Sequence, residues 1–207
     1  MSDRTLAWTY AEDAVIEGDI TRAARATAAE FSIRCVSPAC GNFLTVLAAC
    51  AKVNNAVEIG TGSGVSGLYL LRAGDIHLTT IDVESEAQHV ARSLFARAGA
   101  RPGKVRIING RSADILPRLA AHSYDMVLVD GDPLEAAGDC EEALRILRPG
   151  GLLVVAGALQ GGKVADPARR EEPVVAIRHL IKALMQAEEL DTSLVPLGDG
   201  VLVCRLR

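Results

Sequence analysis

The sequence predicts an α/β protein in which helices cover both faces of a mostly parallel sheet that ends in an antiparallel hairpin. From residue 56 onward, short β-branched apolar runs alternate with longer segments of helical periodicity, which is typical of parallel strands joined by crossover helices. Near the end of the chain, two strand-like runs are joined by Gly198-Asp199-Gly200, a tight-turn sequence that predicts the hairpin. Residues 1–52 differ from both regions, because they are Ala-rich and helical in periodicity.

The N-terminal region is expected to form a helical cap on the sheet. Its helical periodicity covers residues 11–31 and 41–52, and Ser37-Pro38 separates the two segments. No Gly-, Ser- or Pro-rich linker divides this region from the rest of the chain. The 207 residues are enough for one well-covered core and few for two. We therefore expect a single domain, with residues 1–52 as the cap and residues 53–207 as the α/β core.

The expected strands of the core are nearly continuously apolar, as strands covered on both faces must be. They are residues 56–60, 76–82, 105–109, 124–130 and 151–156. Apolar residues at three- and four-residue spacing predict helices at residues 66–73, 84–98, 112–120, 134–147 and 173–189. Gly99 and Arg148-Pro149-Gly150 are stop signals for two of these helices. The closing hairpin comprises residues 192–197 and 201–206.

Charge and hydropathy exclude several classes of function. The net charge of -4 leaves no basic field that could hold a polyanion, so we expect no nucleic-acid partner. The N-terminal sequence MSDRTLAWTYAED has acidic residues where a signal peptide needs a basic start. No later apolar run approaches the roughly 20 residues of a membrane span. We therefore expect a soluble, cytoplasmic protein without a membrane partner.

Neither the cysteines nor the histidines have the spacing of a metal site or a redox pair. The chain contains no C-x-x-C motif, and we interpret the cysteines as buried or unreactive thiols. The scattered histidines are typical of solvated or capping side chains. The residues concerned are Cys35, Cys40, Cys50, Cys140 and Cys204, and His77, His89, His122 and His179.

The strongest local signal is a glycine-rich segment between the first strand of the core and its helix. It runs from Glu58 to Gly64 with the pattern E-x-G-x-G-x-G. Its glycines let a ligand approach the backbone closely, and the following helix offers unpaired N–H groups. A dinucleotide fingerprint beginning at Gly60 would need glycine at position 65, which is valine here. The alternative is structural: the glycines make a turn, and Glu58 is a strand-end carboxylate.

The charge of this segment separates the candidate ligands. Glu58 would place a negative charge near a pyrophosphate, whereas a cationic ligand would be attracted to it. S-adenosylmethionine carries a sulfonium and an ammonium group and therefore fits better. Asp82 lies at the end of the second strand, where a carboxylate can accept hydrogen bonds from both ribose hydroxyls. Because NAD enzymes share this feature, Asp82 predicts a nucleoside without identifying it, whereas the acidic glycine loop predicts S-adenosylmethionine as the cofactor and S-adenosylhomocysteine as its product.

At these residues the chain resembles the class I S-adenosylmethionine-dependent methyltransferases, which have a Rossmann-like sandwich fold. More narrowly, it is similar to the O-methyltransferase family that includes catechol and caffeoyl-CoA O-methyltransferases and their bacterial relatives. The resemblance covers about residues 34–207, and as a set its motifs are far more specific than the glycine loop. The motifs are VSPACGNFL, VEIGTGSGVSGLYLL, TTIDVESE, INGRSADILPRL, YDMVLVDGDP, LRPGGLLVV, GGKVADP and PLGDGVLV.

The resemblance implies a set of cofactor contacts. Val36 would lie against the methionine portion, and Asp82 would hold the ribose with Val83 beside the adenine. Ser112 and Ala113 would flank the adenine edge. The amino-acid end and the neighbouring backbone contacts would come from Glu58, Gly60, Thr61, Gly62 and Ser66.

Two aspartates follow the fourth strand, on the carboxyl edge of the sheet where ligands of open α/β folds bind. We expect Asp132 to contact the cofactor and Asp130 to lie on the substrate side, as the candidate catalytic residue. The alternative for Asp130 is a helix N-cap, since aspartate is a preferred capping residue.

The chain departs from the family where metal-dependent members hold a divalent cation. Those members use the aspartate at position 130 and an Asp-Asn pair just after the fifth strand, and here the pair reads Ala156-Gly157. Gly150-Gly151 and residues 162–167 fix this alignment. A hard cation prefers several oxygen ligands, and a single carboxylate provides too few of them. We therefore expect no tightly bound divalent metal.

The usual proton acceptor of the family is also replaced. The lysine three positions after Asp130 is Pro133 here, which offers neither charge nor N–H. Deprotonation of the acceptor could fall to Asp130, Asp132 or Lys163, and a more acidic acceptor needs little assistance. Lys163 has a simpler interpretation as a solvated loop lysine, because it follows Gly162 in a polar segment.

These observations predict an enzyme that methylates a hydroxyl of a small, aromatic or polyketide-like acceptor without an obligatory metal. The replacements at Pro133, Ala156 and Gly157 motivate an alternative, an S-adenosylmethionine-binding protein with lost or altered catalysis. A third hypothesis is an NAD-dependent oxidoreductase. The Ala-rich faces of the N-terminal helices could pack on a second subunit, and because related bacterial proteins are often dimers, the resemblance implies a homodimer.

Overall fold

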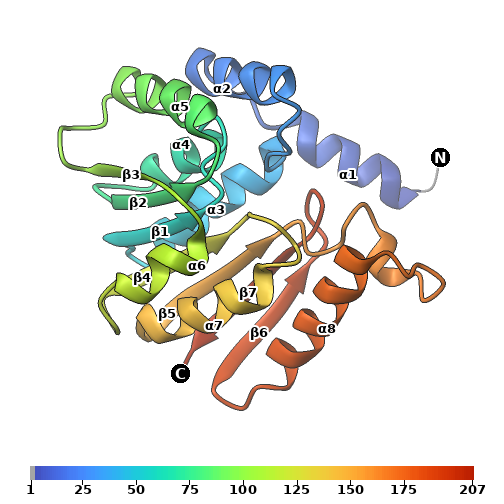
Figure 1. The fold of residues 1–207 in the computed structure, drawn as a ribbon. Coiled ribbons are helices and arrows are strands. Elements are labelled where there is room, and N and C mark those ends of the chain that lie inside the picture. The colour runs from blue at the N-terminus through green and yellow to red at the C-terminus, as the bar shows by residue number, and fades with distance from the viewer. Residues whose placement is uncertain (1–2) are drawn as a thin grey trace.

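A seven-stranded sheet lies at the centre of the molecule, whose computed structural model describes residues 3–207 (Figure 1). The strands are β1 (Asn55–Ile59), β2 (His77–Asp82), β3 (Val105–Asn109), β4 (Tyr124–Val129), β5 (Leu147–Ala156), β6 (Leu190–Val195) and β7 (Val201–Leu206). Their order in the sheet is β3-β2-β1-β4-β5-β7-β6. The first five strands pair in parallel, and β7 is antiparallel to both β5 and β6. The predicted fold class and the closing hairpin are confirmed.

Helices cover the sheet on two sides (Figure 1). They are α1 (Asp3–Asp13), α2 (Asp19–Glu30), α3 (Pro38–Cys50), α4 (Val65–Leu71), α5 (Ser85–Arg97), α6 (Ser112–Ile115), α7 (Ala136–Ile146) and α8 (Glu172–Gln186), with short 3-10 turns η1 (Leu116–Arg118) and η2 (Lys163–Ala165). Helices α2 to α5 lie together on one side, and α6 to α8 lie on the other.

Each face of the sheet has its own hydrophobic core, and β4 shows why the strands are continuously apolar. Met126 and Leu128 pack with the layer of α2 to α5, whereas Val127 and Val129 pack with α7 and α8. Successive side chains of a strand point to opposite faces, so in a strand covered on both sides every side chain is buried and apolar residues are favoured throughout. Burying each of these side chains contributes about 1.5 to 3 kcal/mol.

The expected single helix over residues 11–31 is wrong. The structure has two helices there, because α1 ends at Asp13 and α2 begins after an extended residue, Gly18 (φ -72°, ψ 165°). The intervening segment contains β-branched Val15 and Ile16, which favour helix less than the alanines on either side. The next helix, α3, is confirmed and begins three residues earlier than expected, with Ser37 as its N-cap.

The expected helix over residues 112–120 is much shorter in the structure. Helix α6 ends at Ile115 and continues as the 3-10 turn η1, which contains Pro117. A proline interrupts α-helical hydrogen bonding, which explains the early end. The segment 148–150, expected to lie between elements, belongs instead to β5, which begins at Leu147. Helix α8 ends at Gln186, so β6 begins at Leu190, two residues before the expected start.

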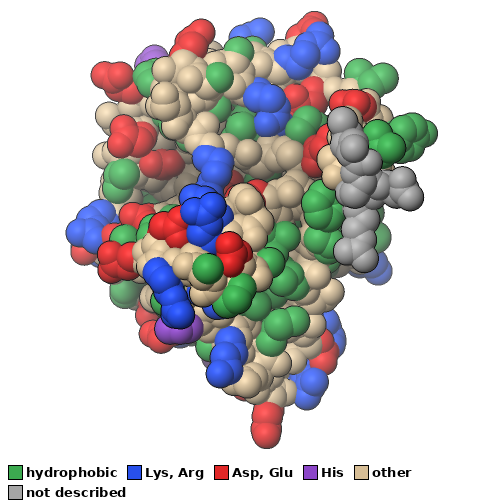
Figure 2. Space-filling model, turned by 90° about the vertical axis from the view of Figure 1, so that its right-hand side faces the viewer, with side chains coloured by type: hydrophobic (Ala, Val, Ile, Leu, Met, Phe, Trp, Pro, Cys, Tyr) green, Lys and Arg blue, Asp and Glu red, His purple; other side chains and the backbone are tan. Residues whose placement is uncertain are grey.

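Two features of the structure concern membrane and nucleic-acid partners: the length and apolarity of the helices, and the distribution of charge on the surface. None of the helices within residues 3–207 combines the length and apolarity that a membrane crossing needs. On the face drawn in Figure 2, Lys and Arg side chains are interspersed with Asp and Glu, and no continuous basic field covers that face. The interspersed charges agree with the net charge of -4.

Candidate active site

The candidate site lies where the carboxyl ends of β1, β2 and β4 meet. Strand β1 lies between β2 and β4 in the sheet, so the chain connections diverge on either side of it. This arrangement is the switch point at which open α/β sheets bind ligands. The loop after β1 crosses the switch point, and the backbone N–H of Asp130 donates to the carbonyl of Ile59 at 2.8 Å, which ties this loop to the end of β4.

Gly60 at the start of the glycine loop cannot be replaced without strain. Its φ is +97°, and a Cβ atom at this position would lie 2.4 Å from the carbonyl oxygen of Asp130. The backbone N–H of Gly60 donates to the carbonyl of Ile81 at 2.9 Å, so the loop is held from both neighbouring strands. Glycine is therefore needed here both for its conformation and for the close approach of two chains.

Asp82 joins the loops that follow β1 and β2. Its Oδ2 accepts a hydrogen bond from the backbone N–H of Gly62 at 2.7 Å, and its Oδ1 accepts one from Glu84 at 3.0 Å. A carboxylate oxygen can accept two hydrogen bonds, so each oxygen retains one acceptor site. The residue is thus both fixed in place and able to bind hydroxyl groups.

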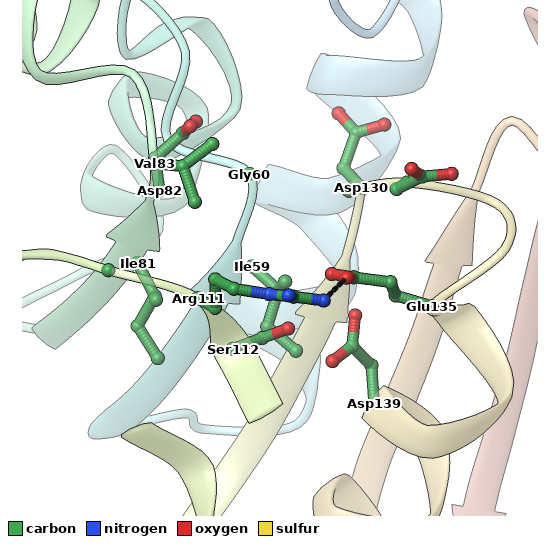
Figure 3. Close-up of a pocket in the computed structure, with 13 residues that line it drawn as sticks. Ile59, Gly60, Ile81, Asp82, Val83, Arg111, Ser112, Asp130, Glu135 and Asp139 are labelled. Carbon is green, nitrogen blue, oxygen red and sulfur yellow. Dashed lines mark hydrogen bonds and ion pairs between the residues drawn. The ribbon is translucent and has the colours of Figure 1, made fainter. Parts of the chain in front are cut away.

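A cavity of about 400 Å³ opens between these loops (Figure 3). Asp82 and Val83 lie on one side of it, and Asp130, Glu135 and Asp139 lie on the other. Apolar and small side chains form its floor and ends, among them Ile59, Ile81 and Ser112. The volume is within the usual range for pockets that bind small molecules.

The charged residues that line this cavity are predominantly acidic. The carboxylates of Asp82, Asp130, Asp132, Glu135 and Asp139 line it, against the guanidinium of Arg111. Arg111 and Glu135 form an ion pair with each other, drawn as a dashed line in Figure 3. The remaining carboxylates give the cavity a negative potential that favours a cationic ligand over a pyrophosphate.

Two smaller cavities adjoin the large one. One of about 50 Å³ is lined by Thr61, Gly62 and Ser66 of the glycine loop and helix α4, together with Asp130. The other, of about 130 Å³, is lined by Val36, Ala156 and Gly157, again with Asp130. Because Asp130 also lines the large cavity, it is the residue that all three cavities share.

Asp130 is not a helix cap. Helix α7 begins at Ala136 with Glu135 as its N-cap residue, so the capping alternative is wrong. Burial raises the pKa of Asp130 to about 7, although the charge of Arg34 lowers it, and Asp199 raises it further. A carboxyl group with a pKa near neutrality can exchange a proton with a bound ligand at physiological pH.

Glu58 lies beneath the glycine loop rather than in a cavity. It is fully buried, and it lines none of the three cavities found among the described residues. Its Oε2 accepts a hydrogen bond from the Thr80 hydroxyl at 2.6 Å, whereas its Oε1 has no partner within the described part of the chain. Burial raises the pKa of Glu58 to about 7, although hydrogen bonds from Thr80 and Ser66 lower it. The acidity of the cleft therefore comes from the other carboxylates.

Hydrogen bonds connect Glu58 to the wall of the site. The Thr80 hydroxyl lies 2.7 Å from that of Thr61, and the side-chain amide of Gln88 donates to Thr61 at 3.2 Å. Gln88 also donates to the carbonyl of Ile108 at 2.9 Å. This buried network crosses β1, β2 and α5 and holds the glycine loop in one conformation.

The other predicted residues divide into those in the cleft and those outside it. Ser112 is buried in the wall of the large cavity, whereas its neighbour Ala113 is exposed and is not among the residues that line it. Asp132 lines the cavity and caps the turn by accepting from the N–H of Leu134 at 2.9 Å. Lys163 is exposed on η2 with its ammonium 3.7 Å from Glu171, so the structure brings it to none of the three cavities.

Arg34 is a residue of the site that the sequence did not indicate. It lies in the segment between α2 and α3 and lines both smaller cavities beside Asp130. No motif surrounds it, and its place depends on the packing of the N-terminal cap over the end of β5. Among the described residues, no group of three or more His, Cys, Asp or Glu side chains is arranged to hold a metal ion.

Comparisons with known proteins agree with this geometry. The sequence profile of the O-methyltransferase family matches residues 10–207. A probable O-methyltransferase from Mycobacterium tuberculosis (strain H37Rv) is 43% identical over 197 residues, covering 94% of this chain and 88% of the relative. The crystal structure of a Corynebacterium glutamicum protein superposes with a TM-score of 0.89 at 33% identity, covering 99% of this chain and 97% of that one. The O-methyltransferase TomG from Streptomyces achromogenes, crystallised with S-adenosylmethionine, has a TM-score of 0.86 at 28% identity, with 100% and 99% covered.

Proposed function

Since the chain belongs to the O-methyltransferase family, we propose that it transfers the methyl group of S-adenosylmethionine to a hydroxyl of a small acceptor at Asp130. The single observation that supports this assignment of the reacting centre is the position of Asp130, which lines all three adjoining cavities. When bound, S-adenosylmethionine supplies an electrophilic methyl group on a positively charged sulfur. The neighbouring TomG was crystallised with that molecule.

The residues of the large cavity suit the adenosyl part of this cofactor. Asp82 has one free acceptor site on each oxygen for the two ribose hydroxyls. Val83 is 57% exposed at the edge of the cavity, where its apolar side chain can lie against the adenine ring, with Ser112 near the adenine edge. Ala113, which does not line the cavity, is left out of this proposal. Asp132 and the other carboxylates provide the negative potential that a sulfonium requires.

The small cavity beside the glycine loop suits the amino-acid end. It is lined by Gly60, Thr61, Gly62 and Ser66, and Val36 lines the adjoining cavity of about 130 Å³. In this proposal Glu58 supports the glycine loop from below, because the Thr80 hydroxyl that donates to its Oε2 also contacts the hydroxyl of Thr61.

Asp130 is the proposed general base. The acceptor hydroxyl gives its proton to the Asp130 carboxylate, and the acceptor oxygen forms a bond to the methyl carbon. The carbon–sulfur bond breaks with its electron pair on sulfur, which leaves neutral S-adenosylhomocysteine. Much of the acceleration comes from holding the oxygen and the methyl carbon in line, which is the task of the cavity walls. Asp132 lines the large cavity but neither of the two smaller ones, so we assign the base to Asp130.

We place the acceptor in the cavity of about 130 Å³ and propose that no tightly bound metal is required. Ala156 and Gly157 offer no side-chain oxygen opposite Asp130, and a hard divalent cation needs several oxygen ligands. The cavity reaches Gly198, beyond which an apolar groove of about 330 Å³ runs along Trp8 and Leu197. This continuation supports an acceptor with an aromatic or polyketide-like body.

The assembly and location of the enzyme are further parts of the proposal. A homodimer is supported by exposed apolar side chains on the N-terminal cap, such as Tyr10 and Ile16, at 77% and 90% exposure. A cytoplasmic location is supported by the cysteines, which are all free thiols in the described part of the chain, as a reducing compartment favours.

The experiment that tests the function combines binding and turnover. Calorimetry should detect S-adenosylmethionine binding by the wild-type protein, and a panel of phenolic and polyketide hydroxyls should yield S-adenosylhomocysteine above background. Asp130→Asn should keep cofactor affinity within about threefold and lower turnover at least about 100-fold, as loss of a general base does. Cofactor binding without turnover of any acceptor would support the binding-protein alternative. Preference for NAD would contradict the proposal.

A further inference from the structure

Arg34 lies in the acceptor cavity with its guanidinium against the backbone of Gly157. The Cζ, Nη1 and Nη2 atoms of Arg34 are each 3.4 Å from the point that a Cβ atom of Gly157 would occupy. Three coplanar atoms at equal distance from one point must present their flat face to it. The N–H groups of a guanidinium lie in its plane, so they point sideways along the cavity and not toward Gly157.

The guanidinium is held in place without its donors being used up. Its Nη1 lies 3.8 Å from Oδ2 of Asp199, a distance that allows charge attraction but exceeds a hydrogen bond. Asp199 is fixed in turn, because its Oδ1 accepts a hydrogen bond from the backbone N–H of Gly161. The side chain of Arg34 is 47% exposed and forms no hydrogen bond with the described residues within standard geometry. Its donors are therefore available to a ligand.

The same guanidinium lies near enough to the proposed general base for its charge to lower the pKa of Asp130. Arg34 and Asp130 line both smaller cavities together. The larger of these cavities is also lined by Ala156 and Gly157, which carry no polar side-chain atoms, and by the polar residues Ser37 and Asp199. A hydroxyl in this cavity therefore enters a site whose lining includes both a carboxylate and a guanidinium.

We propose that Arg34 binds the reacting oxygen of the acceptor and stabilises its negative charge, so that the enzyme selects acceptors with an acidic hydroxyl. This inference rests on the proposed function. As the hydroxyl proton passes to Asp130, the oxygen becomes negative beside the guanidinium, and charge-assisted N–H donors hold it there. Once the oxygen has formed its bond to the methyl carbon, it is a neutral ether and the attraction to Arg34 is lost. The contact thus favours the reactive form of the acceptor over the product.

The test uses the full chain saturated with S-adenosylhomocysteine and 4-nitrophenol as a probe, because the absorbance of the probe reports its ionisation. The wild-type protein is expected to bind the phenolate at least about tenfold more tightly than the neutral phenol. Arg34→Gln should weaken phenolate binding by about 10- to 100-fold, as loss of a charged hydrogen-bond donor does, and should leave binding of the neutral phenol nearly unchanged. Arg34→Lys should recover part of the preference, since it keeps the charge without the planar fork.

A matched control removes one positive charge elsewhere. Arg92 is exposed on α5, and Arg92→Gln should behave as wild type in both titrations. The role of Arg34 would be overturned if wild type and Arg34→Gln bind the phenolate equally, or if wild type does not bind it at all. The proposed function would still stand in either case, provided that S-adenosylhomocysteine binds. Failure of the wild-type protein to bind S-adenosylhomocysteine would overturn both.

Discussion

Replacing Gly60 by alanine places a methyl group into the backbone of the neighbouring strand. The new Cβ would lie 2.4 Å from the carbonyl oxygen of Asp130 and 2.8 Å from its carbonyl carbon, closer than van der Waals contact allows. The residue would also keep a φ of +97°, which costs a non-glycine residue about 1 to 3 kcal/mol. Displacing the end of β4 to relieve the overlap costs about 1 to 3 kcal/mol more. We expect Gly60→Ala to lower the free energy of unfolding by about 2 to 6 kcal/mol.

Urea unfolding measures this loss, and Gly138→Ala is the matched control. Gly138 lies in α7 with a negative φ, and a Cβ there would meet nothing within 4 Å. The same chemical change should therefore stabilise the protein by about 0.5 to 1 kcal/mol, because alanine is the better helix former. Gly60→Ala should also lose S-adenosylhomocysteine binding under conditions in which it is still folded. Unfolding of Gly60→Ala within about 0.5 kcal/mol of wild type would refute the geometry of the loop.

Three further predictions concern the cofactor, the pH dependence of stability and the metal. Asp82→Ala should weaken S-adenosylhomocysteine binding by about 1 to 3 kcal/mol in calorimetry, while Glu141→Ala on the exposed side of α7 should not. Burial alone would raise the pKa of Asp125, but Arg148 and the backbone N–H groups of Asn54 and Asn55 lower this pKa overall. The ionised Asp125 therefore stabilises the fold above the unfolded-state pKa of about 4, and this stabilisation is lost as the pH falls below that value. Asp125→Asn should flatten the acid side of the stability profile from urea unfolding, and an unchanged profile would contradict that sign. EDTA dialysis should leave methyl transfer unchanged, whereas a loss rescued by magnesium would contradict the metal-independent site.

The strands and the position of the cleft could be predicted because they depend on local pattern. Strand β4 is apolar at every position from Met126 to Val129, and both helical layers need that pattern. Asp82 and Asp130 follow strand ends, so the topology of a parallel sheet brings them to one edge. Pro117 is a sequence signal for the early end of α6, but the helical periodicity of residues 112–120 predicts a longer helix.

The positions of Glu58 and Arg34 depend on tertiary packing, which local sequence patterns do not specify. Alternation along β1 puts Glu58 on the same face as Ala56, but which helices cover that face follows from the tertiary fold. For this reason the sequence pattern assigns the negative charge of the site to Glu58, whereas in the structure the carboxylates that line the cavity include Asp82, Asp130 and Asp132. Arg34 reaches Gly157 across more than 120 positions of sequence, and only the folded chain brings them together.

A crystal structure of the protein with S-adenosylhomocysteine tests the central claim most directly. We predict the adenosyl group in the cavity of about 400 Å³, with both ribose hydroxyls on Asp82 and the sulfur facing the Asp130 carboxylate. Density for the ligand outside this cleft, or a sulfur directed away from Asp130, would contradict it.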